Sequence, residues 1–392
     1  MGRANAPEII ARRDESDSPQ LRILLASPYD LTHPGGVTSH VFDLAHQFER
    51  FGHEILVAGP SGDGPLPQNG YTEHVGNSIR FLSPGDSARV NLNPWVHGSV
   101  RELLKTRQFD VIHMHEPFLG FIGASFMRYG EGVKVGTFHT WREGPHVPYI
   151  AFWPLVKHWN NWLDGHVVVS EAARNTISRY IKADYRLIPN GVDFNRFACP
   201  APPPAKFADD RPTLLFVGRI EARKGIPYLL QAYKLVKERV PDARLVIVGE
   251  GGLRPAYQKQ AADMGLKDVY FEGYVTPEEL PSYYQAASVF CSPSTVNESF
   301  GITLLEAMAA GSPAVATSIN GSNTLGEDGV TGLIVPPKDE PAMAAAMQRL
   351  LEDRALAGRL AAAAQERARR FDWENVATDL LDYYAELGAN GR

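Results

Sequence analysis

The chain has 392 residues, of which 44% are hydrophobic and 21% are charged, and its formal net charge is −6 at pH 7. A chain of this length exceeds what one hydrophobic core normally organises, so we expect two domains, and the negative charge excludes a globally basic nucleic-acid-binding protein. The only two cysteines, Cys199 and Cys291, lack ligand-like spacing and indicate neither a zinc site nor a disulfide framework.

The N-terminal residues 1–20 are polar and mixed in charge, and they lack the apolar core of a signal peptide. We therefore expect a flexible tail. No apolar run reaches the roughly 18 residues that span a bilayer. These features predict a cytoplasmic protein, and they leave open a peripheral contact with the inner face of the cell membrane.

Short apolar or β-branched runs alternate with amphipathic helical stretches along the chain, which is typical of βαβ units around parallel sheets. In the first half, a strand over 22–27 leads through a loop to a helix over 36–50. Further strands are predicted over 54–58, 111–114, 133–137 and 167–169.

Gly35 and Gly36 lie between the first strand and the first helix. Two glycines permit positive φ and a close backbone approach, and the helix N-terminus behind them offers unpaired N–H groups to an anion. An ordinary Pro-Gly-Gly turn is the alternative.

Histidines end two successive strands of the first half. His139 follows the strand over 133–137 and should point into a cleft, although a strand-end histidine is often only a surface residue. His113 and His115 end the preceding strand and could suggest a metal site. No third ligand lies at a metal-like spacing, so we interpret this pair as a second strand end that lines the cleft.

Four of the six tryptophans lie between residues 141 and 162. Apolar residues recur there at helical spacing, which is typical of a core helix: Phe152, Val156, Trp159 and Leu163. The alternative is an interfacial patch, because Trp and Tyr favour the membrane boundary. Three cations could then add a basic patch for anionic lipid headgroups: Arg101, Lys105 and Arg107.

A proline-rich segment over 199–205 interrupts the pattern, and its prolines mark a surface connection near a domain boundary. The same scheme then restarts, with six strands predicted over 213–217, 244–248, 269–271, 289–291, 313–316 and 332–335. The last segment, 371–387, is predicted to be helical. The sequence thus predicts an α/β protein of two Rossmann-like domains facing each other across a cleft.

Arg219 and Lys224 follow directly after the strand over 213–217, at the sheet edge where ligands bind in open α/β folds. Arginine can bind phosphate through two hydrogen bonds, and lysine acts as a compact point charge. Solvated loop charges are the alternative. The glycine-rich segment over 248–252 also follows a strand, but the full dinucleotide fingerprint is not met.

The segment over 293–311 carries two carboxylates, Glu298 and Glu306, with seven residues between them in an apolar, helix-forming run. On a regular helix an eight-residue step is a rise of roughly 12 Å. That exceeds the separation of a glycosidase acid/base pair, which is at most about 9.5 Å. The two carboxylates could instead contact two parts of one elongated ligand, and a nucleotide-sugar has about that length. Glu298 would stand in the loop or at the helix N-terminus, where the helix dipole favours its charge, and Glu306 two turns further in.

This segment resembles the E-x7-E motif of the retaining glycosyltransferases of the GT-B type, family 4. Four further motifs fall in the order and spacing of that family: Gly35-Gly36-Val37, Phe138-His139-Thr140, and the segments 188–193 and 218–225. Within the family, Tyr29, the segment 34–40 and His115-Glu116-Pro117 look most like the phosphatidyl-myo-inositol mannosyltransferases. Thr38 departs from that subgroup, which carries there a glutamine that helps to bind inositol phosphate.

The resemblance implies the GT-B fold, with an acceptor domain over 21–190, a donor domain over 191–370 and a helix over 371–392 that crosses back onto the first domain. It implies retaining, metal-independent transfer of a hexose of the mannose or glucose type. The co-substrate would be a GDP- or UDP-linked sugar, with no further cofactor, and the acceptor a lipid or polyol headgroup.

The same resemblance assigns roles to individual residues. Catalytic roles fall on His139, Arg219, Lys224 and Glu298. Donor binding falls on Gly35, Gly36, Gly218, Arg223, Tyr274, Val275, Ser299, Phe300, Gly301 and Glu306. Acceptor binding falls on Tyr29, Thr38 and Thr140. His139 would hydrogen-bond the donor sugar near the reacting carbon. Glu298 would contact the hexose hydroxyls, and Glu306 the nucleotide ribose.

Two other functions suit paired Rossmann-like domains. A nicotinamide-dependent oxidoreductase is disfavoured by the missing fingerprint. A non-catalytic nucleotide-sugar-binding protein is disfavoured because the cations and carboxylates for turnover are all present: Arg219, Lys224, Glu298 and Glu306.

Overall fold

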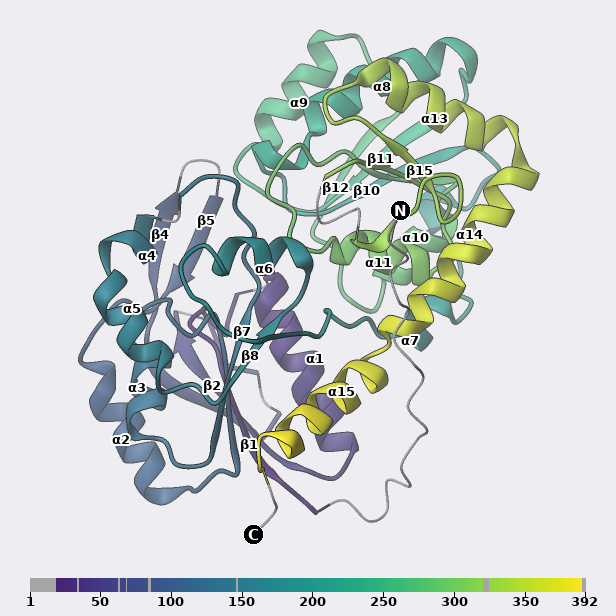
Figure 1. Cartoon of the computed structure of the whole chain (residues 1–392). Helices are drawn as coiled ribbons and strands as arrows, with labels where there is room; N and C mark the ends of the chain where they lie inside the picture. The colour runs from purple at the N-terminus through teal and green to yellow at the C-terminus, as the bar shows by residue number, and fades with distance from the viewer. Residues whose placement is uncertain are drawn as a thin grey trace, which may run out of the picture.

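The structure of the chain is a computed structural model, which describes residues 19–389 apart from 34, 63, 68, 84–85, 146 and 320–323. Two α/β units lie one above the other, each built around its own sheet (Figure 1). The tail expected over 1–20 lies outside the described residues for 1–18, as do residues 390–392 of the expected final helix.

The first unit contains a seven-stranded parallel sheet in the order β3-β2-β1-β6-β7-β8-β9. Its strands are β1 Arg22–Ala26, β2 Glu54–Ser61, β3 Thr72–Asn77, β6 Val111–His115, β7 Val133–Phe138, β8 Gly165–Val168 and β9 Tyr185–Leu187. An antiparallel pair, β4 Ile79–Ser83 and β5 Asp86–Val90, stands beside it. The helices are α1 Gly36–Arg50, α2 Val96–Thr106, α3 Ile122–Tyr129, α4 Val147–Ala151, α5 Trp153–Asn160 and α6 Glu171–Ile177.

The second unit contains a six-stranded parallel sheet in the order β12-β11-β10-β13-β14-β15. Its strands are β10 Thr213–Val217, β11 Arg244–Val248, β12 Val269–Gly273, β13 Val289–Ser292, β14 Ala314–Thr317 and β15 Leu333–Val335. Its helices are α7 Phe194–Ala198, α8 Ile226–Arg239, α9 Arg254–Asp263, α10 Leu280–Ala286, α11 Ile302–Ala309, α13 Glu340–Glu352 and α14 Arg354–Ala368. Short 3-10 turns cover Ala205–Phe207, Ala222–Lys224 and Arg369–Phe371.

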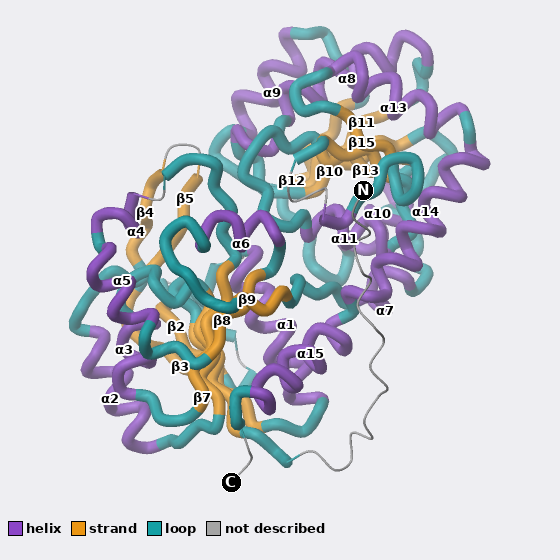
Figure 2. The backbone as a smooth tube through the Cα atoms, in the orientation of Figure 1, coloured by secondary structure: helices purple, strands orange, loops and turns teal. Residues whose placement is uncertain are grey.

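Helices cover both faces of each sheet (Figure 2). In β10, Leu214 and Phe216 belong to one core cluster, whereas Leu215 and Val217 belong to another on the opposite face. All four side chains are buried, so the strand is a continuous apolar run, as expected of a parallel strand buried on both sides. This continuous pattern is what made the strands of the second unit predictable.

Helix α15 (Trp373–Glu386) returns to the first unit and packs against α1. Its Val376, Leu380 and Tyr384 share a buried cluster with Leu44 and Phe48 of α1. The chain therefore crosses between the units twice, and the crossings lie side by side: Val192 and Asp372 form a bridge, and Val192 N donates to Phe371 O at 2.8 Å.

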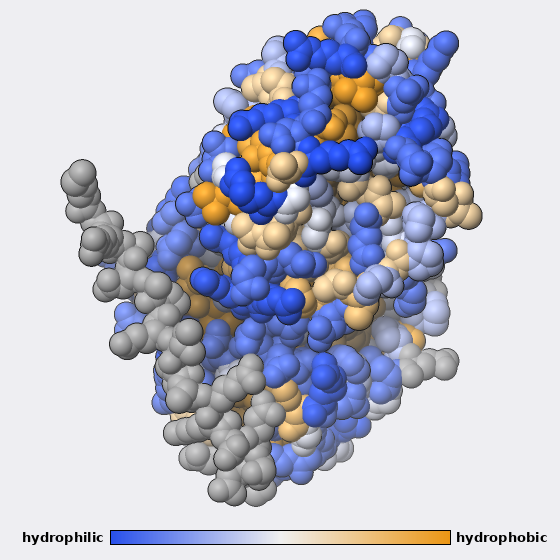
Figure 3. All heavy atoms as spheres, turned by 90° about the vertical axis from the view of Figure 1, so that its right-hand side faces the viewer, coloured by the Kyte–Doolittle hydropathy of each residue, from blue (hydrophilic) through white to orange (hydrophobic). Residues whose placement is uncertain are grey.

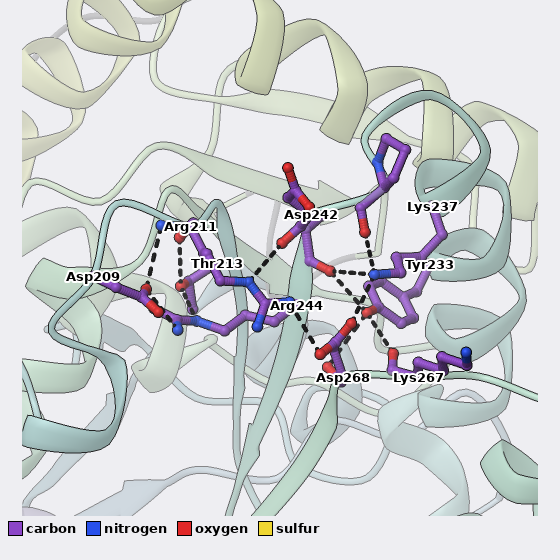
Figure 4. Close-up of polar contacts among 11 residues, drawn as sticks. Asp209, Arg211, Thr213, Tyr233, Lys237, Asp242, Arg244, Lys267 and Asp268 are labelled. Atoms are coloured by element: carbon purple, nitrogen blue, oxygen red, sulfur yellow. Dashed lines mark hydrogen bonds and ion pairs between the residues drawn. The ribbon is translucent and has the colours of Figure 1, made fainter.

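Charged residues at the edge where β10 and β11 begin pair with one another (Figure 4). The buried Arg244 lies 2.8 Å from Asp209 Oδ1 and donates from Nε to Thr213 Oγ1 at 2.8 Å. Lys237 Nζ lies 2.9 Å from Asp268 Oδ2. These cations have structural partners and lie at the edge opposite to the one where the predicted site residues gather.

The surface on the right-hand side of Figure 1 is mainly hydrophilic, with small scattered apolar spots (Figure 3). Among the residues that the structure describes, no helix has both the length and the apolar character to cross a membrane.

Candidate active site

The predicted site residues of the two units meet where the carboxyl ends of both sheets face each other. Trp141, just beyond β7, donates its backbone N–H to Ser299 Oγ of the second unit at 2.9 Å. A Cβ placed on Gly36 would lie 3.7 Å from Ile302 Cδ1. The loop after β7 and the start of α1 therefore contact the segment around Glu298, and the site lies between the two units.

Lys224 and Glu298 form the centre of the second unit's contribution. Lys224 Nζ lies 2.6 Å from Glu298 Oε2, although 74 residues separate them. The loops that carry them are held together at Gly225, which has φ +72°; a Cβ there would lie 1.9 Å from Pro293 O. Only glycine fits such a position without displacing the backbone, so the fold itself brings this cation and this carboxylate into contact.

Both members of this pair are nearly buried, with side chains 11% and 15% exposed. Burial opposes ionisation of Glu298, but the charges of Lys224 and Arg223 outweigh it, and the pKa of the carboxyl lies below its ordinary value. Glu298 is therefore ionised at neutral pH and held by two cations.

Arg219 and Arg223 share a second carboxylate that was not predicted. Glu221 accepts Arg219 Nη1 at 3.0 Å on one oxygen and Arg223 Nε at 3.1 Å on the other. The alternation of Arg, Glu and Arg at every second residue was the available signal for this arrangement. The loop after β10 thus presents three cations and one carboxylate, Glu221, and the cluster remains net positive when Glu298 of the loop before α11 is included.

The two carboxylates of the sequence motif do not lie on one helix. Helix α11 begins at Ile302, after Gly301 with φ +93°, and Glu298 lies in the loop before it. Glu298 thus takes the loop position expected for it and Glu306 the helical one, and the regular-helix distance between them does not apply. Glu306 lies on α11 and accepts a hydrogen bond from Tyr284 Oη at 2.6 Å. Burial, partly offset by this bond, raises its pKa to about 7.

Gly35 and Gly36 do not use positive φ, so that expectation is wrong. Gly35 caps α1 with φ −169°, which any residue adopts, and Gly36 is the first helical residue. A Cβ at Gly35 would lie 3.8 Å from Thr38 Oγ1, an ordinary contact, as at Gly36. Neither backbone strain nor packing explains the pair.

A third histidine joins the strand-end histidines in space, so the expectation that none accompanies them is wrong. His40 of α1 lies with His115 and His139 in a buried cluster whose candidate ligand nitrogens are all within 4.8 Å of one another. His113 does not line the cleft. It is fully buried and is bonded to Tyr384 Oη at 2.5 Å and Thr137 Oγ1 at 2.6 Å.

The geometry of this cluster is that of a hydrogen bond and not of a preformed zinc site. His115 Nδ1 and His139 Nε2 lie 2.9 Å apart and share a hydrogen. Two nitrogens on a tetrahedral Zn²⁺, each at about 2.0–2.1 Å from the ion, stand roughly 3.3 Å apart with both lone pairs aimed at the metal. The histidines are neutral, because burial lowers their pKa values, and neighbouring histidines lower those of His115 and His139 further.

The expected acceptor residues are largely engaged by the protein. Thr140 donates its hydroxyl to Glu116 Oε1 at 2.7 Å, and Thr38 is buried. Tyr29 pairs with Val90 through an isolated antiparallel bridge. Thr140 keeps only acceptor capacity for a ligand.

The other expected donor residues divide into accessible and buried ones. Gly218 directly follows β10 and has φ +154°. Tyr274, which is 62% exposed, and Val275 follow β12 at the same edge of the sheet. The Phe300 side chain is buried against Phe371, so only its backbone can contact a ligand. The same loop provides Ser299 and Gly301.

The tryptophan-rich segment forms α4 and α5, and it is only partly a core element. Val156 and Leu163 are buried and Trp159 packs against the core, as the helical spacing predicted. Phe152 is 56% exposed, which contradicts its place on that stripe. Three further apolar side chains of the segment are exposed: Ile150, Trp153 and Leu155. In the proposed basic patch, Lys105 pairs with Glu102 at 2.5 Å.

Known protein families and relatives match nearly the whole chain. Residues 34–196 match the family model "Glycosyltransferase Family 4", and residues 201–368 match "Glycosyl transferases group 1". The phosphatidyl-myo-inositol mannosyltransferase of Mycobacterium leprae is 35% identical over 95% of this chain and 98% of its own length.

Solved structures of similar shape include sucrose-phosphate synthase from Thermosynechococcus elongatus, with a TM-score of 0.75 and 25% identity over 94% of this chain and all of that one. Anabaena HepE in complex with UDP and glucose has a TM-score of 0.77 and 20% identity, over 94% of this chain and all of its own.

Proposed function

The chain belongs to the GT-B glycosyltransferases of family 4 and transfers a hexose from a nucleotide-sugar to an acceptor, and we propose that a GDP- or UDP-linked donor binds in the cleft with its diphosphate on Arg219 and Lys224. The observation that carries this placement is the net positive loop after β10, whose Lys224 and Arg223 hold Glu298 of the loop before α11. The loop that follows β7 and carries His139 contacts the same segment through the Trp141 N–H and Ser299 Oγ. Departure of the nucleotide develops negative charge on the diphosphate, and fixed cations stabilise it.

We assign Glu298 to the hydroxyls of the donor hexose. Its Oε2 already receives Lys224 at 2.6 Å and Arg223 at 3.6 Å. A carboxylate neutralised in this way is a weak nucleophile. This supports retention by departure and attack on the same face of the sugar, with Glu298 stabilising the positive charge on the hexose.

Glu306 is proposed to accept hydrogen bonds from the ribose hydroxyls, which gives a pH dependence. Because burial raises its pKa to about 7, the carboxyl is increasingly protonated as the pH falls through 7 and loses acceptor capacity. We expect the KM for the donor to rise below pH 7, toward tenfold per pH unit. Donor KM should be measured from pH 6 to 8.5 in the wild type and in Glu306→Gln.

The Glu306→Gln variant should have a higher donor KM at pH 8 and no rise between pH 7 and 6, since its amide does not titrate. A variant whose donor KM still rose like that of the wild type would remove Glu306 from the ribose.

The reaction is proposed to need no metal, because the cations of the loop after β10 neutralise the charge of the diphosphate. The two carboxylates that meet these cations, Glu221 of the same loop and Glu298 of the loop before α11, are both engaged by arginine or lysine. We expect full turnover after exhaustive dialysis against EDTA. Complete loss that Mg²⁺ or Mn²⁺ restores would place a metal site at the diphosphate.

The acceptor is proposed to be a lipid or polyol headgroup, and mannose the hexose, because the curated relatives are named phosphatidyl-myo-inositol mannosyltransferases. Thr38 replaces the glutamine of that subgroup and is buried, so the headgroup need not be inositol phosphate. The exposed apolar side chains of α4 and α5 support peripheral contact with a membrane: Ile150, Phe152, Trp153 and Leu155.

Membrane contact can be tested with the double variant Phe152→Ser/Trp153→Ser and vesicles of phosphatidylcholine with an anionic lipid. Burying one such side chain contributes on the order of 2 kcal/mol, so we expect at least about tenfold weaker partition. Leu253→Ser, which alters an exposed apolar residue of the second unit, is the matched control and should bind like the wild type. Equal binding by all three proteins would remove α4 and α5 from the membrane.

A further inference from the structure

The ring of His139 contacts another buried histidine, His115. Its Nε2 lies 2.9 Å from Nδ1 of His115, and the two rings stack with centroids 5.2 Å apart. The parallel register of β6 and β7 pairs His115 with Thr137, so His139 follows two residues later on the same side. His115 is 1% exposed, and its contact with His139 is built into the sheet.

The direction of this hydrogen bond can be inferred from the atoms that lack partners. Both rings are neutral, so each has one N–H and one bare nitrogen. If His139 Nε2 donated, His115 would carry its hydrogen on Nε2, a buried atom with no partner in the described part of the chain. Buried donors without partners are rarer than buried acceptors without partners. His115 Nδ1 is therefore the donor.

We propose that His115 is a positioning residue, which donates its Nδ1 hydrogen to His139 and fixes His139 in the tautomer that carries hydrogen on Nδ1. His139 then presents an N–H and no bare nitrogen, both to the Asn190 side chain with which it hydrogen-bonds and to a hydroxyl oxygen of the hexose. The functional part of this inference rests on the proposed place of the hexose beside His139. The tautomer itself does not.

Glu116, next to His115, fixes the backbone of His139. Its Oε1 accepts the N–H of His139 at 2.8 Å, the N–H of Thr140 at 2.8 Å and the Thr140 hydroxyl at 2.7 Å. Glu116 has φ +47°, a strained conformation for a non-glycine residue. Strain at such a position is compensated by its surroundings, and here three hydrogen bonds do so. The end of β6 therefore holds both the ring and the backbone of His139.

The tautomer can be measured without any substrate. Histidine side chains labelled with ¹⁵N give distinct shifts for protonated and bare ring nitrogens, and His139→Ala identifies the signals of His139. We expect a neutral ring with hydrogen on Nδ1. Hydrogen on Nε2, or a charged ring at pH 7.5, would overturn the inference. An inactive donor site would leave this result unchanged, so failure of the proposed function is distinguishable.

The consequence for turnover can be tested with two variants of His115. His115→Phe keeps the ring but removes the donor, and we expect kcat to fall about tenfold to a hundredfold with the donor KM unchanged. His115→Asn can place an amide N–H near the former Nδ1 and should retain most of kcat. His97→Phe is the control, because it removes an Nδ1 contact of 2.6 Å with Ser125 Oγ far from the cleft and should not change kcat.

Wild-type kcat in a folded His115→Phe protein would overturn the positioning role, and so would an equal loss in His115→Asn. If His115→Phe does not fold, the spectrum of the wild type alone decides the tautomer.

Discussion

Replacing Lys224 with alanine is expected to lower kcat about a hundredfold, because a lost contact at a developing charge costs on the order of 3 kcal/mol. Arg219→Ala should act in the same direction but less strongly, since the Arg219 side chain is 48% exposed and that of Lys224 only 11%. Steady-state turnover at saturating donor and acceptor measures both effects.

Stability must be separated from catalysis in this experiment. Removing Lys224 takes away the nearest cation of Glu298, and breaking a buried pair typically costs about 3–5 kcal/mol of stability. The double variant Lys224→Ala/Glu298→Gln should recover part of the lost melting temperature but none of the lost activity.

Lys237→Ala is the matched control for the loss of a lysine. It breaks a 2.9 Å ion pair with Asp268 at the opposite edge of the same sheet and should leave kcat unchanged. Near-normal turnover in both Lys224→Ala and Arg219→Ala would contradict the binding of the diphosphate by these cations.

The second large effect separates Glu298 from Glu306. Glu298→Gln should mainly lower kcat, because contacts with the hexose strengthen as positive charge develops on it. Glu306→Gln should mainly raise the donor KM, since a ribose contact is held equally in the ground and transition states. Kinetics of both variants with saturating acceptor, after circular dichroism confirms folding, measure the difference.

The reverse pattern, with kcat lost in Glu306→Gln and only KM changed in Glu298→Gln, would require the donor to lie the other way round in the cleft. Every proposed donor contact of the second unit would then need revision.

The alternation of apolar runs and helical stretches was enough to predict the two parallel sheets. Strands such as 213–217 and 244–248 are continuous apolar runs after their first residue because both sheet faces are covered, and their predicted bounds match the structure. Strand β3 was missed because only Val75 of its six residues is buried, and β9 because it has three residues and is half exposed. Neither β3 nor β9 therefore has the run of apolar residues by which a buried strand is recognised in a sequence.

The candidate site was predictable where a residue follows a strand, as Arg219 and His139 do, because the ends of parallel strands share one edge. What could not be predicted depends on contacts between distant segments. His40 meets His139 only because α1 starts beside β7, and Lys224 meets Glu298 only because Gly225 allows the loops to touch. The regular-helix distance between Glu298 and Glu306 did not apply, because the helix begins only after Gly301 and Glu298 lies in the loop before it.

The central claim is tested most directly by measuring the release of nucleoside diphosphate from three donors: GDP-mannose, UDP-glucose and UDP-N-acetylglucosamine. Phosphatidylinositol vesicles and free polyols are offered as acceptors. We expect one donor to release its nucleoside diphosphate, this release to be suppressed in Lys224→Ala, and the product to keep the anomeric configuration of the donor in its NMR spectrum. Release from no donor above the level of Lys224→Ala, or a product of inverted configuration, would contradict retaining hexose transfer at this cleft.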